Sequence, residues 1–102
     1  MTHPTPNEKC RQLLSQGIRH CKAERWAESL GCLTQALKVD ADNPAIHHFL
    51  GVVYNGLGQH RLAEEHLAVA MAAHPDAYEI LLQLGLARMG CKDYSKAAAA
   101  NR

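Results

Sequence analysis

The chain is poor in aromatic residues and has no strong charge of either sign. Its 102 residues include one Phe, one Trp and three Tyr, and its 11 Lys and Arg nearly balance its 10 Asp and Glu. A formal charge of +1 provides no basic stripe for a phosphate backbone, so we expect no nucleic-acid partner. A composition rich in Ala and Leu favours helices over strands.

Long apolar runs and targeting segments are also missing. No stretch approaches the ~20 apolar residues that cross a bilayer, and the N-terminus lacks the apolar core of a signal peptide. We therefore expect no membrane insertion. Four cysteines without a secretory signal suit a reducing compartment with free thiols, which predicts a cytoplasmic location.

Residue types that could perform chemistry are present, but their spacing does not suit it. The 7 His and 4 Cys form no Cys-x2-Cys pair and no His-Glu-x-x-His motif. His20 and Cys21 are sequence neighbours, and neighbours diverge on a helix. Gly56-Leu57-Gly58 fits a turn between helices and not a phosphate-binding loop. We expect no metal, no cofactor and no catalysis by this chain alone.

The chain does contain a regular repeat, with a period of about 34 residues. The positions in register are Gly17, Gly51 and Gly85; Leu33 and Leu67; Ala36 and Ala70; Ala63 and Ala97; and Trp26, His60 and Tyr94. A fixed period of this length indicates one supersecondary unit copied in tandem. Such arrays usually present a binding surface along the stack.

Turn and cap signals predict six helices in three antiparallel pairs. Thr5-Pro6 with Glu8 starts the first helix, Asp42-Asn43-Pro44 separates the second from the third, and Asp76 caps the fifth. The predicted ranges are about 6–22, 24–39, 44–55, 59–73, Asp76 to about 89, and a sixth from about 93, after a break at Gly90. We expect a flexible tail over residues 1–6 and a single domain over 7–102, with units at about 10–43, 44–77 and a truncated 78–102.

In this register the residues resemble the tetratricopeptide repeat family. The middle unit carries Leu50, Gly51, Tyr54, Gly58, Ala63, Leu67, Ala70 and Pro75, with His47 where the family prefers Trp. The first unit departs from the pattern at Gln16, Ser29 and Ala41, and the third at Arg88 and Asn101. The resemblance implies an all-α, right-handed superhelical stack of about 2.5–3 helix-turn-helix repeats that binds proteins and is not an enzyme.

The resemblance also implies where a partner binds. In this family the odd-numbered helices line a concave groove that holds a peptide or helix. Carried over by register, the lining is Arg11, Leu14, Ile18, Cys21, Ala45, His48, Val52, Asn55, Glu79, Leu82, Leu86 and Met89. This mainly apolar groove suits an amphipathic helix or an extended segment with apolar anchors. The alternative is that residues such as Leu14, Ile18 and Leu82 only pack repeat against repeat.

One subgroup of the family binds acidic C-terminal tails of heat-shock chaperones through Lys, Asn and Arg side chains in the groove. The corresponding positions here are Leu14, Ile18, Phe49, Glu79 and Gln83. These residues provide no cationic clamp, and Glu79 would repel a carboxylate. The sequence therefore predicts a protein or peptide partner of another kind, whose identity it leaves open.

Two further interpretations remain open. The chain could be an N-terminal regulatory or substrate-recruiting domain of a larger enzyme, such as a protein-modifying transferase. It could instead be a self-assembling scaffold, because the predicted third unit lacks a polar capping helix and leaves apolar residues near Leu82 and Leu86 open to self-association. A fragment of a longer array is our preferred explanation for the incomplete third unit.

Overall fold

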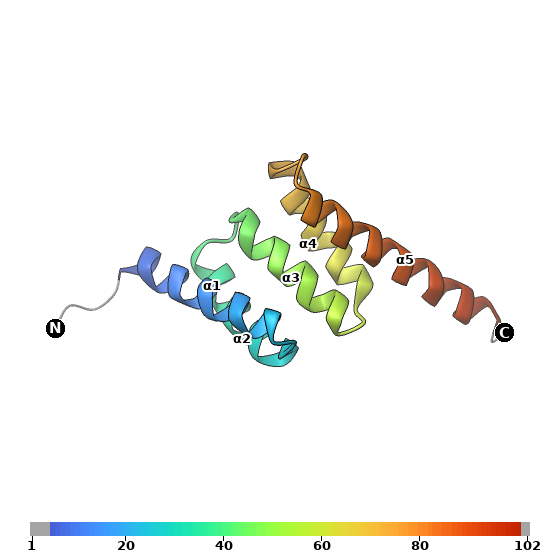
Figure 1. Ribbon diagram of the computed structural model, residues 1–102, viewed down its shortest axis with the longest axis horizontal. Helices are drawn as coiled ribbons and strands as arrows, with labels where there is room; N and C mark the ends of the chain where they lie inside the picture. The colour runs from blue at the N-terminus through green and yellow to red at the C-terminus, as the bar shows by residue number, and fades with distance from the viewer. Residues whose placement is uncertain (1–4, 101–102) are drawn as a thin grey trace.

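The computed structural model describes residues 5–100, with side chains described through Cys91, and this part is a stack of five helices (Figure 1). The helices are α1 (Pro6–Lys22), α2 (Trp26–Val39), α3 (Pro44–Gly56), α4 (His60–Ala73) and α5 (Tyr78–Ala100). Each helix packs on the next in the chain, and α3 also contacts α1 and α5. The predicted all-α stack of helix-turn-helix units is confirmed.

Two helix starts follow the predicted cap chemistry. The Thr5 hydroxyl accepts a hydrogen bond from the backbone N–H of Glu8 at 3.2 Å, and Pro6 occupies the first turn. Asn43 does the same for α3, where its side-chain oxygen accepts from the N–H of Ala45 at 2.9 Å ahead of Pro44. These caps satisfy backbone donors that have no partner inside the helix.

The turns inside the first two helix pairs each contain one residue in the left-handed backbone conformation. Glu24 has φ 60° and Gly58 has φ 78°, and the two positions are one repeat period apart. A residue in this left-handed region cannot belong to a right-handed helix, so α2 begins at Trp26 and not at the predicted Glu24. Glycine takes this conformation without steric cost, whereas Glu24 does so at about 1 kcal/mol.

The predicted break at Gly90 and a separate sixth helix are wrong, because α5 continues through Gly90 to Ala100. The position in register with Glu24 and Gly58 is Lys92, where a left-handed backbone would cost about 1 kcal/mol, as it does at Glu24. Residues 97–100 are all Ala, the strongest helix former, so continuing the helix is favoured. The predicted Asp76 cap is also wrong: Ala77 directly precedes α5, and its carbonyl accepts from the N–H of Leu81 at 3.1 Å.

Parts of two predictions lie outside the described residues. Residues 1–4 of the predicted tail lie outside this range. Its last residue, Pro6, belongs to α1. Asn101 and Arg102, the predicted end of the truncated third unit, also lie outside the described residues.

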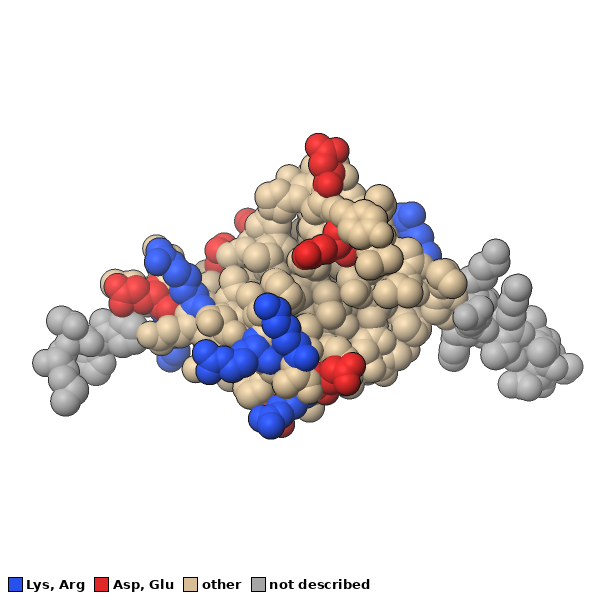
Figure 2. All heavy atoms as spheres, viewed as in Figure 1, with Lys and Arg blue, Asp and Glu red and all other residues tan. Residues whose placement is uncertain are grey.

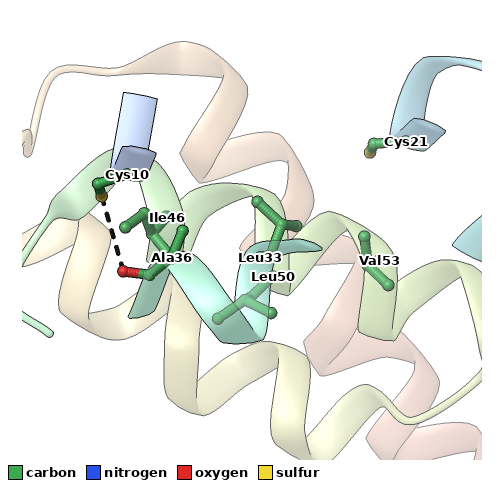
Figure 3. Close-up of a cluster of buried hydrophobic side chains, with 7 residues drawn as sticks. All are labelled: Cys10, Cys21, Leu33, Ala36, Ile46, Leu50 and Val53. Atoms are coloured by element: carbon green, nitrogen blue, oxygen red, sulfur yellow. Dashed lines mark hydrogen bonds between the residues drawn. The ribbon is translucent and has the colours of Figure 1, made fainter. Parts of the chain in front are cut away.

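The first core cluster joins α1, α2 and α3. Its buried members are Cys10, Cys21, Leu33, Ala36, Ile46, Leu50 and Val53 (Figure 3). Cys10 and Cys21 lie at opposite ends of the cluster, and the Cys10 thiol donates to the carbonyl of Ala36 at 3.6 Å. All four cysteines of the chain are unpaired. Burial of this apolar surface is the main stabilising term for the first three helices.

The second core cluster joins α4 and α5. Its buried members are Ala63, Leu67, Ala70, Ile80, Leu84 and Ala87, and Tyr54 of α3 packs against both clusters. Tyr54 therefore connects the two halves of the stack.

Close approach of paired helices explains the repeated glycines. A Cβ built on Gly17 would lie 2.7 Å from side-chain atoms of Leu33, and one built on Gly51 would collide with Leu67. Both leucines are fully buried. The leucine of the second helix in each pair therefore sits on the glycine of the first, and the repeat period marks this contact.

A second glycine contact joins successive helix pairs. The ring of Trp26 fills the space where Gly56 has no side chain, and the ring of His60 does the same at Gly90. Trp26 and His60 are separated by one repeat period, as are Gly56 and Gly90. An aromatic ring at the start of each second helix thus packs on a glycine of the next first helix, at the end of α3 and within α5.

Candidate partner-binding groove

Three helices supply all the predicted groove residues, and they share one side of the stack. Figure 1 shows α1, α3 and α5 towards the viewer, with α2 and α4 behind them. Because α3 contacts both α1 and α5, a segment crossing the three helices would follow a continuous surface. The helices that supply the predicted residues therefore lie next to one another.

The predicted lining residues differ in how much of each side chain is accessible. On α5, Glu79, Leu82, Leu86 and Met89 are exposed, and Arg11 on α1 is exposed too. Leu14, Ile18, His48, Val52 and Asn55 are half-buried, and Leu14 and Val52 also pack against the first core cluster. The predicted lining is thus exposed at all its positions on α5 and half-buried on α3.

The prediction that Cys21 lines the groove is wrong. Its side chain is only 6% exposed, and it belongs to the first core cluster. Burial raises the pKa of the thiol, and the nearby Lys22 opposes this shift only in part. Cys21 therefore packs helix against helix and offers no surface to a partner.

Asn55 is present on this side, but its hydrogen-bonding groups are already used. Its amide nitrogen donates to both the backbone carbonyl and the side-chain oxygen of Gln83 at 3.0 Å. Its side-chain oxygen lies 3.0 Å from Nδ1 of His60, which donates to it because an amide oxygen can only accept. Asn55 thus ties α3 to α4 and α5.

A cleft of about 530 Å³ opens between the starts of α3 and α5. It is lined by Pro44, Ala45, His48, His74, Ala77, Tyr78, Glu79 and Ile80. Ala45, His48 and Glu79 were predicted from the register, whereas Tyr78 and His74 were not. The register considers one helix at a time, and Tyr78 and His74 come together only through the turn from α4 into α5.

His48 and Glu79 give this cleft its polar character. Burial lowers the pKa of His48, and the carboxylate of Glu79 opposes that shift. The imidazole also stacks on Phe49, with ring centroids 4.7 Å apart. A neutral His48 beside a carboxylate offers a hydrogen-bonding pair next to apolar walls, which would orient a bound side chain.

Charge is distributed unevenly along the same side. Figure 2 shows Lys and Arg gathered over α1 and acidic side chains at the start of α5. The exposed basic residues of α1 are Lys9, Arg11, Arg19 and Lys22, and the acidic residues at the other end are Asp76 and Glu79. An elongated ligand lying across the helices would therefore meet opposite fields at its two ends.

The positions that would form a clamp for acidic tails carry no positive charge in the folded chain. Leu14 and Phe49 pack against the first core cluster, and Ile18 is half-buried. Glu79 is exposed at the cleft, and Gln83 is held by Asn55.

His47 and His66 form a contact between α3 and α4. Nε2 of His47 lies 2.7 Å from the carbonyl of Ala41, so this nitrogen carries the proton and donates. Nδ1 of His47 lies 3.0 Å from Nδ1 of His66, within hydrogen-bonding distance. His66 also stacks on Tyr54 with centroids 5.6 Å apart. Both rings therefore have packing roles inside the second helix pair.

Within residues 5–91 no three side chains of His, Cys, Asp or Glu are grouped so that they could hold a metal ion. None of the described helices is both long enough and apolar enough to span a bilayer.

The described residues form an all-α stack of helical pairs in which α1, α3 and α5 share one side. No family model and no solved structure matches the chain. One curated relative is the heat-shock protein cognate (HSC) co-chaperone sgt12 of Aspergillus fumigatus, which is 30% identical over 97 residues. The match covers 95% of this chain but only 28% of the relative.

Proposed function

We propose that the chain is a non-catalytic protein-interaction module of the tetratricopeptide type. It holds a segment of a partner protein across α1, α3 and α5. The observation that carries the proposal is the continuous side formed by these helices, with exposed Leu82, Leu86 and Met89 next to the cleft at His48 and Glu79. Apolar side chains next to a few fixed polar groups are typical of sites that bind amphipathic segments.

The groove favours a partner segment with apolar anchors and a charge at each end. An acidic end would lie over the basic side chains of α1, and a basic end would lie near Glu79. The apolar anchors would meet Val52 and Leu86 between these ends. Similarity to a co-chaperone also supports an interaction role over a catalytic one.

The substitution Leu86→Glu tests the groove. Leu86 is 45% exposed, so the charge should leave the fold intact while it opposes burial of an apolar anchor. We expect at least a tenfold loss of partner capture, because burying an unpaired charge at an apolar contact costs more than the ~1.4 kcal/mol of a tenfold change. Affinity capture with the full chain, followed by quantitative mass spectrometry of the bound proteins, measures the loss.

Val69→Glu on α4 is the matched control, because Val69 is 46% exposed and lies on a helix outside the groove. It should bind partners as the wild type does. Equal capture by the Leu86→Glu variant would show that the groove assignment is wrong. Val52 is a less suitable test position, because it also packs against the first core cluster.

Binding to a heat-shock cognate chaperone is a second candidate function, favoured by the similarity to sgt12. Because the acidic-tail clamp is missing at Leu14, Ile18, Phe49, Glu79 and Gln83, we propose that such binding would not depend on an acidic tail. Titration of the chain with purified cognate chaperone, with and without its C-terminal tail, tests this. A loss of binding when the tail is removed would contradict our reading of the groove.

A further inference from the structure

Helix α5 has a second face that the described helices leave uncovered. One side of the helix buries Ile80, Leu84 and Ala87 in the second core cluster. Tyr78, Leu81, Gly85 and Arg88 lie elsewhere, within about 80° of arc at 100° per residue. All four are exposed, Tyr78 to 73% and Leu81 to 55%. We call these four residues the free face of α5.

The first two helix pairs indicate what belongs on this face. Gly17 lies under Leu33 of α2, and Gly51 lies under Leu67 of α4. Gly85 is the third glycine in this register, yet a Cβ built on it would meet no described atom within 4 Å. The element that fits the free face is therefore an antiparallel helix that places a leucine on Gly85.

We propose that a second copy of this chain supplies that helix, and that two α5 helices pair antiparallel about a two-fold axis. In a two-fold interface the same surface serves both copies. Leu81 of each copy lies on Gly85 of the other, which repeats the leucine-on-glycine contact seen twice within the chain. The same register sets Tyr78 of each copy opposite Arg88 of the other, because both pairs are centred on residue 83.

The chemistry of the paired residues agrees with this register. A guanidinium over a tyrosine ring is a favourable cation–π arrangement, and the two-fold axis would form it twice. The formal charge of +1 per chain gives little repulsion between copies. The free face supplies far fewer residues than the roughly 20–30 a side of a standard interface, so we expect a weak, reversible dimer.

The dimer surface and the partner-binding groove share Tyr78, which also lines the cleft at His48 and Glu79, but the leucines that test them lie on different faces of α5, so the dimer does not rest on the proposed function. Leu86 follows Leu81 by five residues, which places it about 140° further around the helix axis. Leu81 and Leu86 have similar exposure, 55% and 45%, but belong to different faces of α5. They provide a matched pair of positions for separating dimerisation from partner binding.

Sedimentation equilibrium of the full 102-residue chain tests the proposal over ~5–500 μM, because a small interface of this kind requires high protein concentration. We expect a reversible dimer that Leu81→Glu weakens at least tenfold and that Leu86→Glu changes less than twofold. Far-UV circular dichroism verifies that both variants remain helical. A strictly monomeric wild type, or equal weakening by the two variants, would overturn the proposal.

The variant Gly85→Ala distinguishes a second copy from other occupants and does not depend on whether Leu81→Glu folds. In a monomer with the free face open, the methyl group meets nothing, so the unfolding midpoint at ~1 μM should stay the same or rise, because Ala is the better helix residue. Dimerisation should weaken, because the methyl group occupies the site of Leu81 from the other copy. If residues 92–102 of the same chain covered Gly85 instead, the midpoint would fall at every concentration, and the proposal would be wrong.

Discussion

Single glycines decide how closely the helices of this chain approach. Gly51 lies under Leu67, which is fully buried among Ala63, Ala70 and the side chains of α5. An added methyl group on Gly51 must therefore displace the buried Leu67 side chain or push α3 away from α4. Gly31 on α2 is exposed, and a Cβ there meets no described atom within 4 Å.

These two positions give opposite predictions for the same substitution. Gly51→Ala should lower the free energy of unfolding by about 1–2 kcal/mol, because overpacking outweighs the gain in helix propensity. Gly31→Ala should raise it by about 0.5–1 kcal/mol through propensity alone. Urea unfolding followed by circular dichroism measures both. A stabilising Gly51→Ala would contradict the close approach of α3 and α4.

Ser29 shows how a departure from a repeat pattern can have a local cause. It stands in register with Ala63, and from the sequence alone it is a mismatch. In the structure it is fully buried, and its hydroxyl donates to the carbonyl of Gly17 at 2.6 Å. A hydrogen bond of this kind contributes about 1 kcal/mol and ties α2 to α1. The register marks Ser29 only as a departure, because it cannot identify a hydrogen-bond partner twelve residues earlier on another helix.

Among whole helices, α3 and α5 begin differently although their starts are in register. Asn43 caps α3 through its side chain, whereas Ala77 occupies the same place before α5 and has no side-chain acceptor. Asn43→Ala should therefore cost about 1 kcal/mol, and Ala77→Asn should return a similar amount at the start of α5. Thermal unfolding of both single variants and of the double variant provides the test.

In the double variant the two effects should nearly cancel. No change from Ala77→Asn would indicate that the start of α5 has its backbone donors satisfied in another way.

The helix boundaries show what sequence reasoning can and cannot supply. Thr5, Asn43 and Gly58 act through neighbours a few residues away, so the starts of α1 and α3 and the turn before α4 could be predicted. Whether α5 ends near Gly90 depends on two opposing terms. A reversed sixth helix would bury apolar surface, but it would require Lys92 to take a left-handed conformation, which costs free energy. That balance is set by packing and not by local propensity.

The same limit applies to the groove. Spacing predicts which residues of α1, α3 and α5 share a side, because helix periodicity is regular. It could not tell that Cys21 would be buried or that Asn55 would be held by Gln83 and His60. Those outcomes depend on contacts between helices, and a single-helix pattern contains no information about them.

For the molecule as a whole, half-buried histidines make stability depend on pH. Burial lowers the pKa of His66, His47 adds to the shift, and Glu65 opposes it. Burial also lowers the pKa of His48 against the effect of Glu79. Because both pKa values are lower in the folded chain than the ~6.5 of an unfolded one, the unfolded chain binds more protons in this range.

The stability contributed by neutral His48 and His66 is therefore present above about pH 6.5 and is lost as the pH falls through the folded-state pKa values. We expect the urea midpoint to decrease between about pH 7.5 and pH 5. The decrease should be smaller in the double variant His48→Gln/His66→Gln. The exposed His74, changed to Gln, is the control. An equal decrease in the wild type and the double variant would show that other groups dominate.

The contact between Trp26 and Gly56 has a practical consequence. Trp26 is the only tryptophan of the chain, and its ring lies at the junction between the first and second helix pairs. Its fluorescence emission should therefore report separation of the two pairs, whereas circular dichroism reports loss of the helices themselves. If the pairs part before either melts, the emission should shift to longer wavelength while the ellipticity is still unchanged. The fluorescence of Trp26 thus measures cooperativity between the first and second helix pairs without an added label.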